Sequence, residues 1–197
     1  MAKSSKEWLR RHVSDPYVRK ARQEGYRSRA AYKLLELDQK HSLFKPGMTV
    51  LDLGAAPGGW SQVAAQKVKP GGQVIAIDVL EMAPISGVTT LRGDFRTLSI
   101  ENPVDVVLSD VSPNLSGIPN VDQARLLELA LAAIELCAKV LKRDGVFVVK
   151  AFHGEAFDEL RERLGAVFQK VKVVKPSASR GESAETYAVA RGLRRLG

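Results

Sequence analysis

The chain has 197 residues, 45% of them hydrophobic, so it is long enough to form one domain with a substantial core. It lacks the run of roughly 20 apolar residues that crosses a bilayer, and its start has no apolar signal-peptide core, so we expect a cytoplasmic protein without a membrane partner. The net charge of +8 favours an acidic partner, and the single cysteine, Cys137, excludes an internal disulfide and is expected in the core.

The charge is concentrated at the two ends of the chain. Residues 1–45 hold 12 Lys and Arg against 5 Asp and Glu, and residues 170–197 hold 7 against 2, which leaves the segment between them acidic. This segregation favours a polyanion that binds across one edge of the domain, with a merely solvated charged face as the alternative. We expect a single domain over residues 1–197, with a basic extension at about residues 1–27.

Basic and aromatic side chains alternate in the first segment. The residues are Arg10, Arg11, Arg19, Lys20, Arg22, Arg27 and Arg29, with Trp8, Tyr17, Tyr26 and Tyr32 among them. Arginines neutralise phosphates and aromatic rings stack on unpaired bases, so the mixture suits RNA better than duplex DNA. Apolar residues then recur at helical spacing from Ala30 to Leu37, with Ser28 as a candidate N-cap. Lys33 lies on this helix, and its position alone predicts a solvated lysine.

A short apolar strand over residues 50–53 runs into a glycine-rich turn, Gly54-Ala55-Ala56-Pro57-Gly58-Gly59, and then into a helix over residues 61–69. Glycines let a backbone pass close to a ligand, and the first turn of a helix presents unpaired N–H groups. The stretch therefore predicts a nucleotide-type site at the end of a first parallel strand, although such glycines also serve turn geometry alone.

Three further strands deliver a carboxylate to the same edge. The strands are expected over residues 73–78, 88–91 and 104–110, and the carboxylates are Asp78, Asp94 and Asp110. Open parallel sheets bind ligands at the carboxyl ends of their strands, and an acid at the end of the second strand is placed to accept hydrogen bonds from ribose hydroxyls.

The second half of the chain continues the alternation. We expect a long helix over residues 122–141, a strand over 146–150 that ends on Lys150, a helix over 155–164, and strands over 167–174 and 186–190. Helices alternating with strands predict a three-layer α/β fold with a seven-stranded, mostly parallel sheet. Lys150 would emerge at the edge that carries the aspartates, although a lysine at a strand end can also be simply solvated.

Two motifs that the glycine turn lacks reduce the range of candidate cofactors. The dinucleotide pattern G-x-G-x-x-G is broken at Ala56, and the Gly-Lys-Ser/Thr ending of a P-loop is missing. A nucleoside cofactor without phosphates remains, namely S-adenosylmethionine, with Asp78 on its ribose. Carboxylates around the site would also favour its positively charged sulfonium.

Three motifs resemble the FtsJ/RrmJ family of ribose 2′-O-methyltransferases over nearly the whole chain. They are Asp52-Leu53-Gly54-Ala55-Ala56-Pro57-Gly58-Gly59-Trp60-Ser61-Gln62, then Ser109-Asp110-Val111-Ser112-Pro113-Asn114-Leu115-Ser116-Gly117, and Val148-Val149-Lys150. The resemblance implies a Rossmann-like S-adenosylmethionine-dependent methyltransferase fold. It also implies a catalytic tetrad of Lys33, Asp110, Lys150 and Glu185, for which Glu182 is a nearby alternative to the last. The cofactor contacts it implies are Gly58, Trp60, Asp78, Asp94 and Asp110, with no metal.

The expected reaction is 2′-O-methylation of a uridine ribose in 23S ribosomal RNA of the large subunit, at the level of the assembled 50S particle and by a monomer. Lys150 is the expected base, because a ribose hydroxyl must lose its proton to attack a methyl group. Alternatives are a 2′-O-methyltransferase of transfer RNA and a non-catalytic RNA-binding factor of ribosome assembly. A nucleobase amino methyltransferase is disfavoured, because Asp110-Val111-Ser112-Pro113-Asn114 lacks the double proline and aromatic residue typical of that class.

Overall fold

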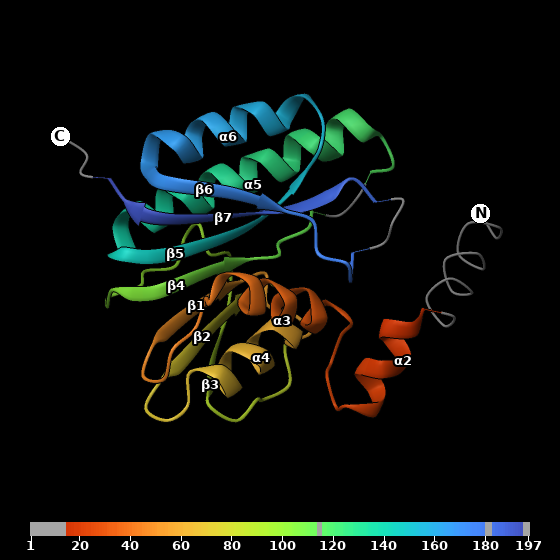
Figure 1. The fold of residues 1–197 in the computed structure, drawn as a ribbon, viewed down its shortest axis with the longest axis vertical. Helices are drawn as coiled ribbons and strands as arrows, with labels where there is room; N and C mark the ends of the chain where they lie inside the picture. The colour runs from red at the N-terminus through yellow and green to blue at the C-terminus, as the bar shows by residue number, and fades with distance from the viewer. Residues whose placement is uncertain (1–14, 114–115, 180–182, 195–197) are drawn as a thin grey trace.

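The sheet is the centre of the molecule. The computed structural model describes residues 15–113, 116–179 and 183–194, and within them seven strands pair in the order β3-β2-β1-β4-β5-β7-β6 (Figure 1). The strands are β1 Thr49–Leu53, β2 Gln73–Asp78, β3 Val88–Arg92, β4 Val104–Ser109, β5 Leu141–Phe152, β6 Phe168–Val174 and β7 Glu185–Leu193. The five strands from β3 to β5 in this order are parallel, and β7 runs antiparallel to both β5 and β6. The predicted seven-stranded, mostly parallel sheet is thus confirmed.

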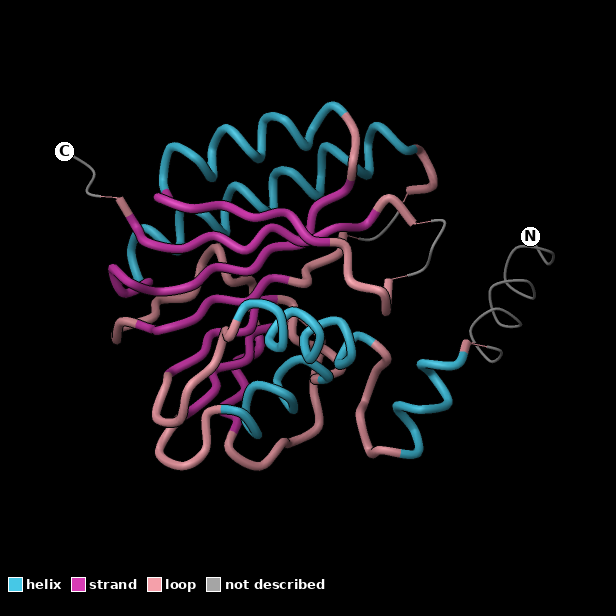
Figure 2. Tube along the Cα trace, viewed as in Figure 1, coloured by secondary structure: helices cyan, strands magenta, loops and turns pink. Residues whose placement is uncertain are grey.

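Helices cover both faces of this sheet. Helices α3 (Ala30–His41) and α4 (Gly59–Lys67) lie on one face, and α5 (Pro119–Val140) and α6 (Glu155–Val167) lie on the other (Figures 1 and 2). The short helix α2 (Pro16–Gln23) stands apart from these layers, on the side where the parallel strands end. The three-layer α/β arrangement follows from the sequence, because each helix has one apolar face to bury against the sheet.

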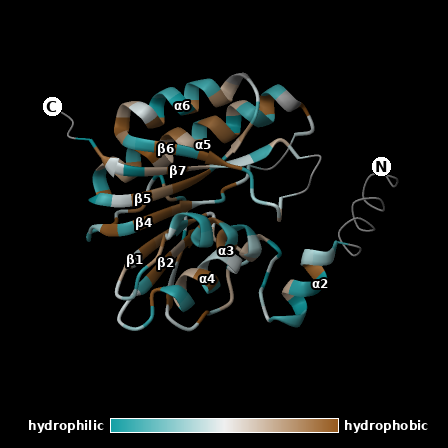
Figure 3. Ribbon diagram, in the orientation of Figure 1, coloured by the Kyte–Doolittle hydropathy of each residue, from teal (hydrophilic) through white to brown (hydrophobic). Residues whose placement is uncertain are grey.

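The central strands are apolar on both sides because both faces are covered. Leu51 and Leu108 are fully buried in neighbouring strands, as is Phe147 in β5, and Figure 3 shows the hydrophobic colouring concentrated in these strands. Cys137 lies in the core between α5 and the sheet, as predicted. Within the described ranges, the helices are all too short or too polar to cross a membrane.

Local boundaries differ from the sequence prediction where side-chain capping was assumed. Ser28 is not the N-cap of α3, because that helix begins at Ala30 and its N-cap, Arg29, makes no side-chain capping bond. The hydroxyl of Ser28 instead lies against the start of α4, where a Cβ on Gly59 would approach its oxygen to 2.3 Å. Glycine at position 59 therefore lets the segment just before α3 pack closely against the start of α4.

The strand order places one natural ligand site. Strand β1 pairs with β2 on one side and with β4 on the other, so successive crossovers leave β1 in opposite directions. In open α/β sheets, ligands bind at this switch point, beyond the carboxyl ends of the strands. The glycine turn after β1 and the segment after β4 therefore meet at the expected position.

Candidate active site

The turn after β1 is held against the segment after β4. Gly54 has a φ of +69°, and a Cβ at this position would lie 2.9 Å from the Cα of Val111. A side chain here would be strained by the backbone conformation and would also clash with backbone. Glycine is thus required for the turn to approach Asp110, which directly precedes Val111.

A cavity of about 370 Å³ opens at this switch point. Its lining includes Gly54 and the three carboxylates Asp78, Asp94 and Asp110, which the sequence predicted at one edge of the sheet. The cavity falls within the size range of small-molecule sites. The structure thus brings together the three predicted aspartates, which come from the ends of separate strands.

Asp78 and Asp94 are held in different ways. The Asp78 carboxylate accepts the main-chain N–H of Ala56 at 2.9 Å and that of Leu80 at 2.8 Å, one on each oxygen. Since a carboxylate offers about four acceptor positions, two remain open, which suits the two hydroxyls of a ribose. Asp94 is contacted by Arg96 through its main chain and its side chain. Bonds from Arg96 hold the pKa of Asp94 below its ordinary value.

A fourth aspartate lies beneath the turn. Asp52 in β1 is fully buried, and its Oδ2 accepts a hydrogen bond from the Ser61 hydroxyl at 2.6 Å, whereas Oδ1 has no partner among the described residues. Burial, together with the charges of Asp110 and Asp78, raises the pKa of Asp52 to about 7. The sequence analysis quoted this residue within a motif without assigning it a role.

Gly58 and Trp60 do not line the cavity. The Trp60 ring is buried, donates its indole N–H to the carbonyl of Ala30 at 2.8 Å, and packs 5.5 Å from the Tyr187 ring. Gly58, with a φ of +108°, passes so close to Ile85 that a Cβ would lie 2.5 Å from its methyl group. Both residues stand at the start of α4, where main-chain N–H groups have no acceptor within the helix.

Arg27 fastens the segment after β2 to the glycine turn. Its guanidinium donates to the carbonyls of Pro57 at 3.2 Å, Ala83 at 2.6 Å and Pro84 at 2.7 Å. The sequence analysis grouped this arginine with those expected to bind phosphates. Its three carbonyl partners show a structural role that residue type and local charge do not reveal.

The lysine–carboxylate cluster, defined as Lys33, Asp110, Lys150 and Glu185, forms next to the cavity. Lys150 on β5 lies 3.1 Å from Oδ1 of Asp110 and donates to the Asp110 carbonyl at 2.9 Å. Lys33 on α3 lies 2.7 Å from Glu185, the first residue of β7. The structure thus brings together all four residues that the resemblance names, and Asp110 belongs to both the cluster and the cavity. The alternative acid, Glu182, lies outside the described residues.

Tyr187 connects the two ion pairs of this cluster, and the sequence analysis missed it. Its hydroxyl donates to Oδ1 of Asp110 at 2.7 Å and accepts from Lys33 at 3.3 Å. In the antiparallel pairing of β5 and β7, Tyr187 lies directly opposite Lys150. Strand alternation also places Tyr187 on the same face as Glu185, and this spacing was the available signal.

The lysine charges of the cluster stabilise the ionised form of Asp110. Burial opposes the ionisation of Asp110, but the charges of Lys150 and Lys33 and the bond from Tyr187 outweigh it, and the pKa of Asp110 lies below its ordinary value. Burial and the neighbouring carboxylates raise the pKa of Tyr187 well above its ordinary value, so its hydroxyl stays a neutral donor. Asp110 is thus an ionised acceptor that can orient an amine beside a ligand.

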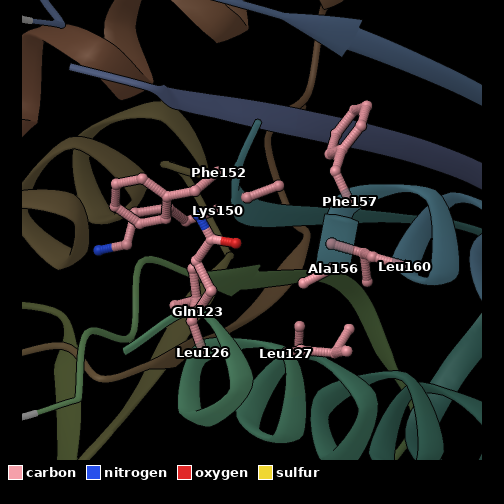
Figure 4. A pocket seen from close by; sticks show the side chains of 10 residues that line it. Gln123, Leu126, Leu127, Lys150, Phe152, Ala156, Phe157 and Leu160 are labelled. Atoms are coloured by element: carbon pink, nitrogen blue, oxygen red, sulfur yellow. The ribbon is translucent and has the colours of Figure 1, made fainter. Parts of the chain in front are cut away.

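A second, smaller cavity lies beside Lys150, between β5, α5 and α6. Figure 4 shows that mostly apolar side chains surround it, among them Leu126, Phe157 and Leu160. Its volume is about 10 Å³, roughly the space of a single water-sized probe. This space is too small to hold a nucleoside.

The aromatic residues near the N-terminus serve packing more than the sequence suggested. Tyr32 is buried, and its ring lies 5.5 Å from that of Tyr17 and 5.7 Å from that of Tyr26. Arg29 pairs with Asp15 and donates to the carbonyl of Ala178. These contacts dock α2 onto the start of α3, so the ring faces expected to stack on bases are in part covered. Trp8, Arg10 and Arg11 lie outside the described residues.

The fold and the cavity together define an α/β protein with a ligand-sized cavity at the switch point of its sheet. A family model described as FtsJ-like methyltransferase matches residues 26–193, and the chain belongs to this family. The resemblance seen in the sequence motifs is thus confirmed.

Relatives of known name span the whole chain. Ribosomal RNA large subunit methyltransferase E of Nitrosospira multiformis is 53% identical in an alignment 201 residues long, which covers 98% of each chain. The protein of the same name from Cellvibrio japonicus is 49% identical over 98% of this chain and 95% of its own.

Solved structures agree on the fold. A structure described as a ribosomal RNA methyltransferase of Plasmodium falciparum has a TM-score of 0.76 and 31% identity, and covers 85% of this chain and 98% of its own. Fibrillarin of Aeropyrum pernix, with bound S-adenosyl-L-methionine, has a TM-score of 0.60 and 19% identity over 84% of this chain and 75% of its own, which shows the fold alone.

S-adenosylmethionine is the methyl donor of this family, and the predicted cofactor is confirmed. The residues present fit it. Asp78 offers two free acceptor positions for a ribose, and the Asp110 carboxylate offers a negative charge for a sulfonium. Glycine at position 54 keeps the floor of the cavity free of a side chain.

Proposed function

We propose that this chain methylates the 2′-hydroxyl of a uridine ribose in 23S ribosomal RNA, with the assembled 50S particle as its substrate. The observation that carries the proposal is the lysine–carboxylate cluster beside the cofactor cavity, joined to it by Asp110. The names of the relatives from Nitrosospira multiformis and Cellvibrio japonicus support the large ribosomal subunit as the source of the RNA.

The sheet order suggests how the cofactor lies. Asp94, Asp78 and Asp110 follow β3, β2 and β4, in the spatial order β3-β2-β1-β4. We place the base at Asp94, the ribose at Asp78 and the sulfonium near Asp110, so that the base is farthest from the cluster. The carboxylate end would lie near Gly58 and Trp60, because the first turn of α4 supplies main-chain donors.

The cofactor, when bound, supplies a methyl group on a positively charged sulfur. Lys150 would accept the proton of the ribose hydroxyl as that oxygen takes up the methyl group. Asp110 holds the Lys150 amine by a contact of 3.1 Å, which fixes the direction from which the hydroxyl must approach. Lys33 and Glu185 form the second pair and would orient the ribose.

The basic ends of the chain would hold the RNA around this cluster. We propose one domain with a basic extension at about residues 1–27, acting as a monomer in the cytoplasm. Helix α2, which belongs to this extension, docks beside the start of α3, the helix that carries Lys33, through the pairing of Arg29 with Asp15. A polyanion bound along α2 would therefore reach the cluster.

The test uses ribosomal particles from cells that lack the protein. Purified protein is incubated with these large subunits and with S-adenosylmethionine tritiated in its methyl group, and the labelled nucleotide is identified as resistant or sensitive to alkaline hydrolysis. The proposal expects one alkali-resistant uridine in 23S RNA. Lys150→Ala should give no label, and Lys139→Ala, a change of an exposed lysine on α5, should label as the unchanged protein does.

The other candidate functions give different results in the same assay. Label in transfer RNA instead of large-subunit RNA would favour the transfer RNA enzyme. Tight binding to subunits without any label would favour the non-catalytic assembly factor. Equal labelling of free 23S RNA and of assembled particles would contradict the requirement for the 50S particle.

A further inference from the structure

Asp94 and Arg96 form a hydrogen-bonded ion pair at the wall of the cofactor cavity. The main-chain N–H of Arg96 donates to Oδ1 of Asp94 at 2.9 Å, its Nε lies 3.0 Å from each oxygen, and its Nη2 lies 2.6 Å from Oδ2. Both residues line the cavity. The arginine fork thus engages both oxygens of a carboxylate that stays about 31% exposed and lines the cavity.

The contacts from Arg96 occupy most of the acceptor positions of the Asp94 carboxylate. Three N–H groups of Arg96 engage Asp94 through four contacts, because the Nε–H is shared between the two oxygens, and a carboxylate offers about four acceptor positions for separate donors. One position remains, and it suits a single N–H donor. Asp78 differs, because two main-chain donors leave it two positions, which suit a diol.

Arg96 is itself anchored. Its Nη1 donates to Glu128 on α5 at 3.1 Å, and the turn that carries it is closed by Thr97, whose main-chain N–H and hydroxyl each bond to the Asp94 carbonyl at 3.0 Å. The Asp94 carboxylate is therefore held by the main chain and the side chain of Arg96, and Glu128 and the turn at Thr97 support Arg96. A planar guanidinium holds a carboxylate in a fixed plane, which a lysine does not do.

We propose that Arg96 is the positioning residue for the base of the cofactor, turning Asp94 so that its open acceptor position receives one N–H of the adenine amino group. This inference rests on the proposed placement of the base at Asp94. It assigns selectivity for adenine to Arg96, a residue that does not itself bond to the base. The low pKa of Asp94, caused first by the side-chain bond from Arg96, keeps this acceptor ionised throughout the neutral range.

The selectivity is measured with two ligands that differ at one edge of the base. Calorimetry compares S-adenosylhomocysteine with S-inosylhomocysteine, in which a carbonyl oxygen replaces the amino group and would face the carboxylate, and N1 carries a hydrogen. We expect the unchanged protein to prefer the adenine ligand by about 10- to 150-fold, the worth of a hydrogen bond to a charged group. Arg96→Gln should weaken adenine binding about tenfold and reduce the preference to a few-fold.

Two further variants separate positioning from loss of charge or of folding. Arg96→Lys keeps a cation without the fork and should fall between the unchanged protein and Arg96→Gln. Arg92→Gln removes the same charge at the end of β3, where the guanidinium makes one 3.4 Å bond to the carbonyl of Val79, and should keep the full preference. In turnover, Arg96→Gln should raise KM for S-adenosylmethionine and leave both kcat and KM for RNA unchanged.

The outcomes distinguish this inference from the placement of the base. If the unchanged protein prefers adenine and Arg96→Gln keeps that preference, the role of Arg96 is wrong and the placement stands. If Arg96→Gln binds adenine more tightly, Arg96 competes with the base and the inference is overturned. If the unchanged protein binds both ligands equally, the placement at Asp94 fails and the role of Arg96 fails with it.

Discussion

Tyr187 donates its hydroxyl hydrogen to Asp110 over 2.7 Å and, by accepting from Lys33, joins the two ion pairs of the lysine–carboxylate cluster. Both ion pairs are direct contacts, so they persist without the hydroxyl. We therefore expect Tyr187→Phe to lower kcat by roughly 10- to 100-fold, the worth of one hydrogen bond to a charged group, with KM for S-adenosylmethionine unchanged. Steady-state kinetics on large subunits would measure this. A loss as large as that of Lys150→Ala would show that the hydroxyl takes part in the proton transfer.

Lys150→Ala should abolish methyl transfer and leave cofactor affinity within a few-fold. The change removes the proposed proton acceptor, whereas the cofactor keeps Asp78, Asp94 and the carboxylate of Asp110. Single-turnover labelling measures the first effect, and calorimetry with S-adenosylhomocysteine measures the second. Because Asp110 loses a buried partner, a thermal melt must show that the variant is folded. Turnover that survives the change would eliminate Lys150 as the base.

Asp52 should make the free energy of unfolding fall with rising pH. Its pKa is about 7 in the native state and near 3.8 in an ordinary setting, so between these values the native state binds more protons than the unfolded chain. The loss should be up to about 1.4 kcal/mol per pH unit in that window and should end above about pH 7.

Asp52→Asn keeps an acceptor for Ser61 and should flatten this dependence. Urea unfolding of both proteins at pH 5, 6, 7 and 8 measures it, and the difference between the two profiles isolates Asp52 from other titrating groups such as His41. Burial lowers the pKa of His41, so its contribution has the opposite sign. Parallel profiles would contradict the assignment to Asp52.

Gly54→Ala should cost more stability than Gly47→Ala. The two positions have similar positive φ values, +69° and +83°, but a Cβ at position 54 would lie 2.9 Å from the Cα of Val111, whereas position 47 has no atom within 4 Å. Gly47→Ala should cost about 1 kcal/mol from backbone strain alone. Gly54→Ala should cost about 1–3 kcal/mol more, because the added methyl group must displace the backbone at Val111. It should also raise KM for S-adenosylmethionine, because Val111 directly follows Asp110 in the chain. Equal losses in urea unfolding would show that the turn adapts.

Sequence sufficed for the features that follow from periodicity. Buried strands read as apolar runs, and carboxylates at their ends can only gather at one edge, so Asp78, Asp94 and Asp110 were predictable as a group. Lys33 and Glu185 were named from the resemblance alone, because their pairing depends on how α3 packs against β7, far away in the chain.

The features that sequence did not reveal depend on partners brought together by tertiary packing. Arg27 and Arg29 look like any other basic residue of the first segment, yet the structure engages them with carbonyls and with Asp15. The burial of Asp52 depends on α4 covering its face of β1, where Ser61 donates to it. Tyr187 needed the pairing of β5 with β7, an antiparallel contact between the fifth strand and the seventh that strand alternation alone does not fix.

Arg19 and Arg22 on α2 should bind RNA phosphates. Both are exposed, and the described part of the chain offers neither an ion-pair partner, whereas Arg27 and Arg29 are engaged within the protein. The double change Arg19→Gln with Arg22→Gln should weaken RNA binding and reduce the slope of log affinity against log salt by about 1.5, since each phosphate contact contributes about 0.7–0.9. Cofactor affinity should not change, because α2 does not line the cavity.

The matched control removes the same two charges from α6. Arg161→Gln with Arg163→Gln alters exposed residues on the helix layer opposite α3 and should leave the salt slope unchanged. Filter binding of a 23S fragment at about 50 to 300 mM salt measures the salt slope of both variants. Counterion release dominates the affinity in this range. If the two double variants weaken binding equally, RNA senses only the net charge of the protein, and α2 has no specific role in docking. A change confined to the α2 variant would place the RNA backbone along this helix.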